Sequence, residues 1–427
     1  MNTRAANERA ALVGLITGAS RRVDAERSLD ELAGLATTAG AQVVLRVLQE
    51  RPRPDASTFL GSGKLASLAG ACDEVSADVV VFDNELSPAQ LRQIEARVDR
   101  KVVDRTQLIL DIFASRARSR EGKLQVELAQ LKYLLPRLVG AGLVLSRLGG
   151  GIGTRGPGET KLETDRRRIR HRISAISRQI DVVRRRRALS RERRRKVSQP
   201  SVALVGYTNA GKTTLFNQLA REHGVTSDAL FVTLDPLVRR VRVGDRFEFL
   251  LGDTVGFIDR LPHQLVAAFR ATLEEVAGAD LLLHVIDAAS PGRARREAAV
   301  RSVLEEAGAA QVPALSVYNK CDLLEEADRA RIALQEPGAL CVSALTGEGR
   351  DELLEVVASR LALDTVRVVL RFDPTDPADA DRIGRLYRHA RVIQHVVGGG
   401  RVSIDAEVPR RFLARLVSEP GADEVGE

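Results

Sequence analysis

The sequence predicts a multidomain α/β protein with four successive parts: an N-terminal parallel α/β domain, an antiparallel helical hairpin, a second α/β domain and a small α+β C-terminal domain. Three observations predict this. Short apolar runs alternate with helical patterns near the start, two heptad seams follow, and a buried strand then runs into a glycine-rich loop and a helix. A chain of 427 residues is also too long for one hydrophobic core, which predicts two to four domains.

The composition excludes several classes of protein. The three cysteines (Cys72, Cys321 and Cys341) share no metal-binding spacing, and so sparse and odd a set is typical of a reducing cytosol. No apolar run approaches the about 20 residues that a membrane span needs, and the polar N-terminus has no secretory h-region. We therefore expect a cytoplasmic protein without a membrane span, whose net charge of +8 favours a polyanionic partner.

The N-terminal domain is expected over residues 1–108. Its apolar runs predict buried strands, and each helical pattern between them opens with a serine that fits an N-cap. Strands are expected at 11–17, 42–48 and 77–83, and helices at 28–40 and 87–98. The sequence FLGSGKL at 59–65 lacks the spacing of a phosphate-binding loop, and no Ser or Thr follows Lys64, so we expect a flexible turn there.

The hairpin is expected over residues 109–198, because two apolar series keep the alternating spacing of three and four residues that a heptad seam requires. The first series ends near Pro136, which should kink or end its helix. The members of the two series are Leu110, Phe113, Ala117, Leu124, Leu128, Leu131, Leu135 and Leu138, and then Leu162, Ile169, Ile173, Ile176, Ile180 and Val183.

The second hairpin helix is strongly basic, with sixteen Lys and Arg residues against four Asp and Glu residues between Lys161 and Lys196. The acids are too few for i,i+4 pairing to balance this charge, and the block contains no aromatic residue for base stacking. Nucleic-acid phosphates are therefore the expected partner, with a merely solvated face as the alternative. The candidate RNA-contacting residues are Arg155, Lys161, Arg166, Arg167, Arg168, Arg184, Arg185, Arg186 and Arg187.

The glycine-rich stretch LGGGIGTRGPGETK, residues 148–161, joins the two hairpin helices. It lacks the GK[ST] ending of a P-loop, and no apolar strand precedes it. Spacing alone leaves two interpretations open. The stretch is either a flexible tip that uses the conformational freedom of glycine, or an exposed apex whose backbone amides and Arg155 hold RNA phosphates or bases.

A P-loop pattern follows the hairpin. The apolar strand SVALV leads into GYTNAGKT, residues Gly206 to Thr213, which matches GxxxxGK[ST] in the required strand–loop–helix context. The loop amides and the helix dipole would cradle phosphates, Lys212 would contact the β and γ oxygens, and the Thr213 hydroxyl would bind Mg²⁺. The sequence therefore predicts a nucleotide triphosphate site.

Two further segments fit the γ-phosphate and magnesium end of such a site. Asp253 and Gly256 belong to DTVG, directly after a predicted strand at 246–251. The aspartate is expected to hold Mg²⁺, and the glycine to offer its amide to the γ-phosphate. Thr233, in FVTLDP, is the candidate for a switch threonine that binds Mg²⁺ only when the γ-phosphate is present.

Two more segments fit the base. Asp322, in NKCD after the strand ALSVY, carries a carboxylate that can accept hydrogen bonds from both N1–H and the 2-amino group of guanine. Adenine has neither donor, so this residue would select GTP. The backbone of Ser343 to Leu345, after ALCV, fits a contact to guanine O6. Together these motifs predict a Ras-like P-loop GTPase domain over 199–362.

The predicted site residues fall into three classes. The catalytic residues are Lys212, Thr233 and Gly256, and the metal ligands are Thr213, Thr233 and Asp253. The nucleotide-binding residues are Gly206, Tyr207, Thr208, Asn209, Ala210, Gly211, Lys212, Thr213, Thr214, Phe231, Val232, Thr233, Leu234, Asp235, Asp253, Thr254, Val255, Gly256, Asn319, Lys320, Cys321, Asp322, Ser343, Ala344 and Leu345.

Phe257 follows Gly256 at the position where Ras-like GTPases carry the Gln that orients the attacking water. A phenylalanine cannot orient water. We therefore expect slow unaided hydrolysis, unless another residue or a partner positions the water.

The C-terminal domain is expected over 363–427, with a strand at 366–372, a helix at 380–390, two strands around Gly398 to Gly400 and a final helix. It carries no residue pattern that indicates chemistry.

The chain resembles the HflX family of GTPases over about residues 78–345. The resemblance is carried by GGGIGTRGPGETKLETDRR, GYTNAGKTTLF, TLDP, DTVGFI and NKCD, and by REGKLQVELAQL, which is not a general GTPase feature. It implies binding to the large (50S) ribosomal subunit and its rRNA, GTP hydrolysis stimulated by the ribosome, and ribosome splitting or rescue under stress. It also implies a ribosome-reaching apex for the glycine-rich stretch, and some family members turn over ATP as well. Thr213 stands where Ser is more usual, and either hydroxyl serves Mg²⁺.

Two alternatives to a ribosome-splitting GTPase stay open. One is a GTP-dependent rRNA-maturation factor, and the other is a nucleotide-switched protein-interaction module. In each case we expect GTP or GDP as the ligand and Mg²⁺ as the cofactor. We also expect the free protein to be a monomer in the cytoplasm, with some peripheral association with a membrane.

Overall fold

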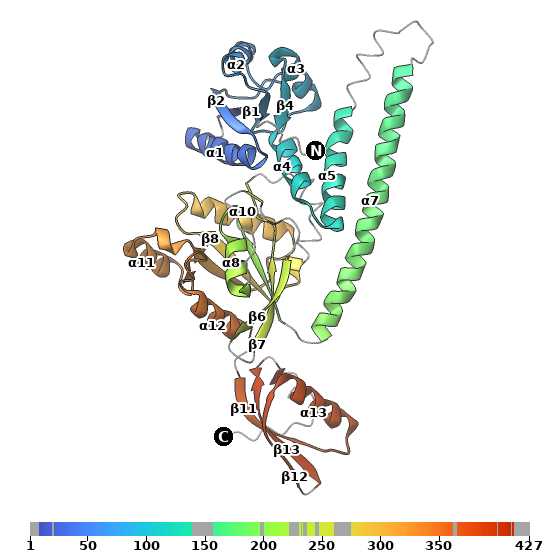
Figure 1. Ribbon diagram of the computed structural model, residues 1–427, viewed down its shortest axis with the longest axis vertical. Coiled ribbons are helices and arrows are strands. Elements are labelled where there is room, and N and C mark those ends of the chain that lie inside the picture. The colour runs from blue at the N-terminus through green and yellow to red at the C-terminus, as the bar shows by residue number, and fades with distance from the viewer. Residues whose placement is uncertain are drawn as a thin grey trace, which may run out of the picture.

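The computed structural model describes residues 8–18, 21–138, 157–196, 200–221, 230–231, 233, 237–243, 247–259, 275–361, 365–398, 400–410 and 412–413. Its three sheets follow one another along the long axis of the molecule, and one long helix runs beside the first two (Figure 1). The glycine-rich stretch up to residue 156, with Arg155, and most of the predicted final helix lie outside the described residues.

The N-terminal part is a four-stranded parallel sheet in the order β2-β1-β3-β4, flanked by helices. Its elements are β1 (Arg9–Ile16), α1 (Arg22–Thr38), β2 (Gln42–Glu50), α2 (Ser62–Glu74), β3 (Val79–Phe82), α3 (Pro88–Val98) and β4 (Lys101–Asp104). The inner strands β1 and β3 are buried almost throughout, as parallel strands covered on both faces must be. The predicted parallel α/β domain is therefore confirmed.

Two helices of this part differ from the prediction. The first helix begins at Arg22 rather than at Ser28, and its N-cap Arg21 makes no side-chain cap, so no capping signal marked its start. A helix, α2, begins at Ser62 where a flexible turn was expected. The Ser87 cap of α3 is confirmed, because Ser87 and Gln90 form a complete capping box.

The first hairpin seam consists of two helices instead of one. The helix α4 (Arg105–Arg116) ends at Ala117, whose backbone is extended, and α5 (Arg120–Arg137) starts again behind the N-cap Ser119. The early seam members Leu110, Phe113 and Ala117 therefore pack in the core below the N-terminal sheet. The boundary expected between 108 and 109 falls inside α4. Pro136 lies in the last turn of α5, as predicted.

The hairpin itself pairs α5 with α7 (Pro157–Lys196), which run side by side in Figure 1. Leu124 and Leu128 pack against Ile176 and Ile180, which are members of the two predicted seams. Arg172 reaches across to both carboxylate oxygens of Glu127, at 2.6 and 2.9 Å. The basic end of α7 continues beyond this seam.

The central part is a six-stranded sheet in the order β10-β9-β8-β5-β7-β6, in which only β6 is antiparallel. The strands are β5 (Ser201–Gly206), β6 (Leu237–Val243), β7 (Phe247–Asp253), β8 (Leu281–Asp287), β9 (Ala314–Asn319) and β10 (Leu340–Cys341). The helical elements are α8 (Lys212–Ala220), α10 (Arg293–Glu306), the 3₁₀ turn η2 (Cys321–Leu323), α11 (Glu326–Gln335) and α12 (Arg350–Arg360). The motif residues thus follow the carboxyl ends of parallel strands, where α/β sheets bind ligands.

The C-terminal part is a three-stranded antiparallel sheet in the order β11-β13-β12, with one helix packed on it. Its elements are β11 (Thr365–Phe372), α13 (Pro377–His389), β12 (Arg391–Gly398) and β13 (Arg401–Pro409). The α+β prediction for this part is confirmed.

One hydrophobic cluster joins the N-terminal and central parts. Leu35 and Phe113 of the first part share it with Phe231, Phe257 and Ile258 of the second. The two parts lie directly against each other near α1, α4 and α10 (Figure 1). Within the described ranges, no helix combines the length and the apolar content that crossing a bilayer requires.

Candidate nucleotide-binding site

The loop after β5 has a backbone that only glycine fits at two positions. Gly211 has φ of +88°, and a Cβ there would lie 2.2 Å from the side-chain nitrogen of Asn319. Gly206 has φ of +154°, and a Cβ there would lie 2.2 Å from the carbonyl oxygen of Val285. The loop therefore passes so close to its neighbours that side chains at these positions are excluded.

Lys212 opens α8 and is buried below the loop. Its Nζ donates to the carbonyl oxygens of Gly206 at 3.0 Å and Tyr207 at 2.8 Å. Burial lowers the pKa of Lys212 to about 8, and the nearby charge of Asp253 opposes part of this change. Among the described residues, this ammonium hydrogen-bonds to backbone carbonyls and to no carboxylate, and phosphate oxygens would supply a counter-charge.

Three oxygens converge beside the loop, from the three residues predicted to bind metal. The Thr213 and Thr233 hydroxyls lie 2.8 Å apart, and they donate to Oδ2 of Asp253 at 2.9 and 2.7 Å. The other carboxylate oxygen, Oδ1, is buried and has no hydrogen-bond partner in the described part of the structure. Burial raises the pKa of Asp253, and the Thr233 hydroxyl is the largest of the groups that oppose this.

This cluster fits a magnesium ion. Mg²⁺ prefers oxygen ligands in octahedral geometry at about 2.1 Å, which places neighbouring ligands about 3 Å apart. The three mutual distances are close to that value, and the free carboxylate oxygen leaves acceptor capacity. Among the residues that the structure describes, no three His, Cys, Asp or Glu side chains gather into another metal-binding group.

The end of the site that is predicted to hold guanine is organised by Asn319. Its side-chain nitrogen donates to the carbonyl of Ala210 at 2.8 Å, and its side-chain oxygen accepts from the amide of Ala344 at 2.9 Å. The residue thereby ties the phosphate loop to the loop after β10. Lys320 adopts φ of +66° and its Nζ donates to Asp287 at 2.8 Å. Asp322 follows in η2 and faces the cavity.

A cavity of about 440 Å³ runs along these motifs. Most of the predicted residues line it. These are Thr208, Asn209, Gly211, Lys212, Thr213, Thr214, Phe231, Thr233, Thr254, Gly256, Asn319, Lys320, Asp322, Ala344 and Leu345. Leu323 also lines it and was missed, although its place directly after Asp322 was a usable signal.

Several predicted nucleotide-binding residues do not line the cavity, namely Gly206, Tyr207, Ala210, Asp253, Val255, Cys321 and Ser343. Asp253 belongs to the oxygen cluster, and Cys321 and Ser343 are buried beneath their loops. The Tyr207 hydroxyl points away from the cavity and donates to Glu31 of the N-terminal part at 2.6 Å. Val232, Leu234 and Asp235 lie outside the described residues.

Phe257 offers nothing to the cavity. The residue is 3% exposed and packs in the cluster shared with the N-terminal part. Its backbone pairs with the phosphate loop instead, because its carbonyl accepts from Thr208 at 2.6 Å and its amide donates to Gly206 at 3.1 Å. The position that carries Gln in Ras-like GTPases is therefore structural here.

The candidate RNA-contacting arginines form two groups on α7. Arg166, Arg167 and Arg168 lie in its first half, and Arg184, Arg185 and Arg186 lie about 27 Å further along the axis at 1.5 Å per residue. Arg167, Arg168, Arg185 and Arg186 are exposed, whereas Arg166 and Arg184 are half-buried. The side chains of Lys161 and Arg187 lie outside the described residues.

Comparison with known proteins places the chain in a family. Three family models match it in succession: "GTP-binding GTPase N-terminal" at 26–114, "GTP-binding GTPase Middle Region" at 116–194 and "50S ribosome-binding GTPase" at 201–320.

Individual relatives match most of its length. GTPase HflX of Caldanaerobacter subterraneus subsp. tengcongensis is 46% identical over 96% of this chain and 93% of its own. GTPase HflX of Alkalihalophilus pseudofirmus is 54% identical over 70% of each chain, and that of Escherichia coli K12 is 44% identical over 92% of each. The chain belongs to the HflX family of GTPases, P-loop enzymes that bind and hydrolyse GTP.

Proposed function

We propose that this protein is a magnesium-dependent GTPase that binds the large ribosomal subunit and its rRNA, and that its nucleotide state controls this binding. The observation that carries the proposal is the convergence of Thr213, Thr233 and Asp253 beside Lys212. Thr233, which precedes β6, lies at the proposed metal position. The position of this residue would therefore depend on whether a γ-phosphate is bound. Splitting or rescue of stalled ribosomes under stress is the output proposed for this switch.

Guanine selection is assigned to Asp322. It lines the cavity beside Leu323 and Leu345, which offer apolar contact to a planar base. A carboxylate accepts from two donors of guanine, and adenine would leave it unpaired in a half-enclosed site. Asn319 holds this end of the cavity at a fixed distance from the phosphate loop.

Phosphate chemistry is assigned to residues at the other end. Lys212 would exchange its carbonyl partners for β and γ oxygens, and the Gly256 amide would donate to the γ-phosphate. Thr213, Thr233 and Asp253 would hold Mg²⁺, which neutralises charge that develops on the phosphates. Because Phe257 is buried, water would be oriented by a group outside the chain or by another cavity residue.

RNA binding is assigned to α7. Arg167, Arg168, Arg185 and Arg186 are exposed on this helix, and the ion pair of Arg168 with Asp165 is long, at 3.6 Å. Such an exposed pair contributes little to stability, so a phosphate can replace Asp165 as the partner of Arg168 at small cost. We further propose a cytoplasmic monomer, whose recruitment to ribosomes depends on salt.

The experiment that tests the function is nucleotide turnover with and without purified 50S subunits. The proposal expects GTP preferred over ATP, Mg²⁺ dependence, a slow rate alone and a clear increase with 50S subunits. If 50S subunits leave the turnover rate unchanged and free precursor rRNA raises it, the protein is an rRNA-maturation factor instead of a GTPase that acts on ribosomes. An absence of any RNA effect would favour a protein-interaction module.

A further inference from the structure

Helix α4 of the N-terminal part touches both segments that read the γ-phosphate in the proposed function. Its first residue, Arg105, contacts the segment after Gly256, and Phe113 contacts the segment before Thr233. The two residues lie about 12 Å apart along one helix. A single rigid element therefore spans both candidate switch segments, and it comes from outside the nucleotide-binding part.

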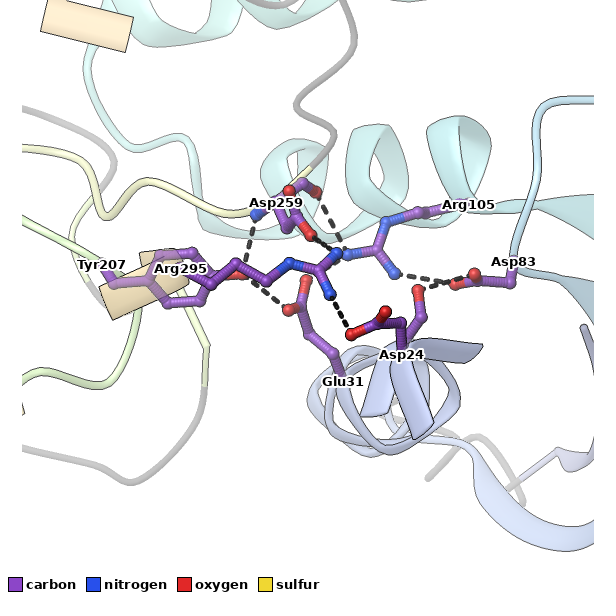
Figure 2. Close-up of polar contacts among 8 residues, drawn as sticks. Asp24, Glu31, Asp83, Arg105, Tyr207, Asp259 and Arg295 are labelled. Atoms are coloured by element: carbon purple, nitrogen blue, oxygen red, sulfur yellow. Dashed lines mark hydrogen bonds and ion pairs between the residues drawn. The ribbon is translucent and has the colours of Figure 1, made fainter. Parts of the chain in front are cut away.

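The Arg105 end is a buried polar cluster (Figure 2). The guanidinium is 4% exposed and pairs with Glu31 and, at 2.9 Å, with Asp83. It also donates to the backbone carbonyl of Asp259 at 3.2 Å. A buried guanidinium is stable only while hydrogen-bond acceptors surround it. Moving the Asp259 carbonyl away from Arg105 would therefore destabilise the folded protein.

Asp259 is held by its other groups as well. Its amide donates to the Tyr207 hydroxyl at 2.7 Å, and that hydroxyl donates to Glu31. Its carboxylate pairs with Arg295 of α10, which also reaches Asp24 of α1 at 3.3 Å. Tyr207 belongs to the phosphate loop, so the cluster connects this loop, the segment after Gly256 and the N-terminal part.

The Phe113 end is apolar. The rings of Phe113 and Phe231 lie 4.6 Å apart at 62°, an edge-to-face pair. Phe231 is 2% exposed, has φ of +56° and lines the nucleotide cavity two residues before Thr233. The amide of Leu230, next to it, donates to the Thr38 hydroxyl of α1 at 3.1 Å.

The same helix is tied to the hairpin. Asp104 is the N-cap of α4, and its side chain accepts from Gln107 at 2.9 Å. Its second oxygen accepts from Arg137 in the last turn of α5 at 3.0 Å. A displacement of α4 would therefore disturb the C-terminal end of α5, the hairpin helix that packs against α7.

We propose that Arg105 and Phe113 are positioning residues of the GTPase site, which hold the Thr233 and Gly256 segments in the arrangement that favours GTP over GDP. The inference rests on the proposed function for the role of these two segments. In the structure Thr233 already stands at the metal position, so contacts that keep it there stabilise the triphosphate state. Coupling between two binding sites is reciprocal. If the bound nucleotide changes the affinity of the hairpin for its partner, docking on that partner changes the ratio of GTP affinity to GDP affinity by the same factor.

The test uses the full chain without ribosomes, and measures the affinity for GDP and for a non-hydrolysable GTP analogue in Mg²⁺. Phe113→Leu and Arg105→Gln are expected to lower the ratio of analogue affinity to GDP affinity by at least about five-fold, the lower end of usual coupling. Arg105→Lys keeps the charge and should restore part of the ratio.

Matched controls are available in the same domain. Phe82 is a fully buried aromatic in another cluster, and Arg100 is a partly buried arginine paired with Asp73. Phe82→Leu and Arg100→Gln should lower thermal stability as the test variants do, and leave the ratio unchanged. If all four variants shift the ratio in proportion to lost stability, α4 is a structural element only and the proposal is wrong.

Tyr207→Phe and Glu31→Gln supply a second arm, since the first removes both hydrogen bonds of the Tyr207 hydroxyl and the second removes the charge that pairs with Arg105. Each change should lower the ratio of analogue affinity to GDP affinity, and the effect of the double variant should differ from the sum of the two single effects. Additive effects would show that the two residues do not act as one cluster. A wild-type protein whose nucleotide preference ignores Mg²⁺ would overturn the proposed function itself, which separates that failure from the failure of this inference.

Discussion

The hydroxyl of Thr233 lies 2.7 Å from the carboxylate of Asp253, although twenty residues separate them in the sequence. Asp253 ends β7 and is fully buried, whereas Thr233 belongs to the segment between α8 and β6. Their contact brings a loop residue to the end of a sheet strand beside the P-loop. Such a contact can exist in one nucleotide state and be lost in the other, which is what a switch requires.

Removing the Thr233 hydroxyl should weaken the triphosphate state selectively. Thr233→Ala is expected to lower affinity for a GTP analogue in Mg²⁺ by about 10- to 100-fold, with GDP affinity changed less than about two-fold. Thr375→Ala removes an exposed threonine hydroxyl of the C-terminal part, outside the cavity, and serves as the control that leaves both affinities unchanged. Equal losses of GDP and analogue affinity, measured by titration, would remove Thr233 from the metal site.

The base assignment can be reversed chemically. Asp322→Asn replaces an acceptor by a donor, so GDP affinity should fall by at least about 100-fold. Xanthine carries a carbonyl where guanine carries the 2-amino group, so the variant should bind xanthosine diphosphate better than the wild type does. Unchanged guanine preference in competition binding would show that Asp322 does not read the base.

Glycine substitutions at two positions should have opposite effects. Gly211→Ala places a Cβ 2.2 Å from Asn319 at a positive φ, so nucleotide binding should be lost. Gly63 lies in α2 with nothing within 4 Å of an added Cβ, so Gly63→Ala should stabilise by roughly 0.5 to 1 kcal/mol. Thermal unfolding and GDP titration of both variants check this pair, and retained GDP affinity in Gly211→Ala would contradict the loop geometry.

His284 should make the protein sensitive to acid. Burial lowers the pKa of His284 to about 4, and the charge of Arg301 adds to this. Between pH 6.5 and 4 the unfolded chain binds a proton that the folded chain does not, so stability falls as the pH is lowered through that window. From pH 7 to 5 the wild type should lose about 2 kcal/mol more than His284→Gln.

Urea unfolding followed by circular dichroism measures this difference, because the chain has no tryptophan. Parallel pH profiles for the wild type and the variant would mean that His284 titrates normally in the folded protein.

Charge reversal on α7 should affect RNA and leave the nucleotide alone. Arg184→Glu, Arg185→Glu and Arg186→Glu together should weaken 50S binding and flatten its salt dependence by about 0.7 to 0.9 in log–log slope per lost phosphate contact. GTP binding in solution should stay intact, since no residue of α7 is among those that line the cavity. Unaltered 50S affinity would leave the basic end of α7 as a solvated face.

The chemistry of the site was predictable because each motif follows a strand, and parallel strands bring their carboxyl ends together. Thr213, Asp253 and Asp322 could be assigned in this way from the sequence. Leu323 was missed because a leucine carries no polar signal, so that only its place directly after Asp322 marked it. Tyr207 was expected to bind nucleotide because it lies in the loop pattern, but its hydroxyl bonds Glu31, which is distant in sequence.

The helices show a different limit. The heptad spacing of Leu110, Phe113 and Ala117 continues into the seam of α5, so the pattern predicted one long helix. Tertiary packing instead places these three residues in the shared core, and the chain breaks at Ala117 before the Ser119 cap. Periodicity reports that a face is apolar, and the partner of that face is set by contacts that sequence spacing does not contain.

Co-sedimentation with 50S subunits tests the central claim most directly, with GTP analogue, GDP or no nucleotide, each with and without Mg²⁺. The account predicts that the protein pellets with 50S subunits when analogue and Mg²⁺ are both present, and that Thr233→Ala loses this difference. Equal pelleting of the wild type in every nucleotide and metal condition would contradict it.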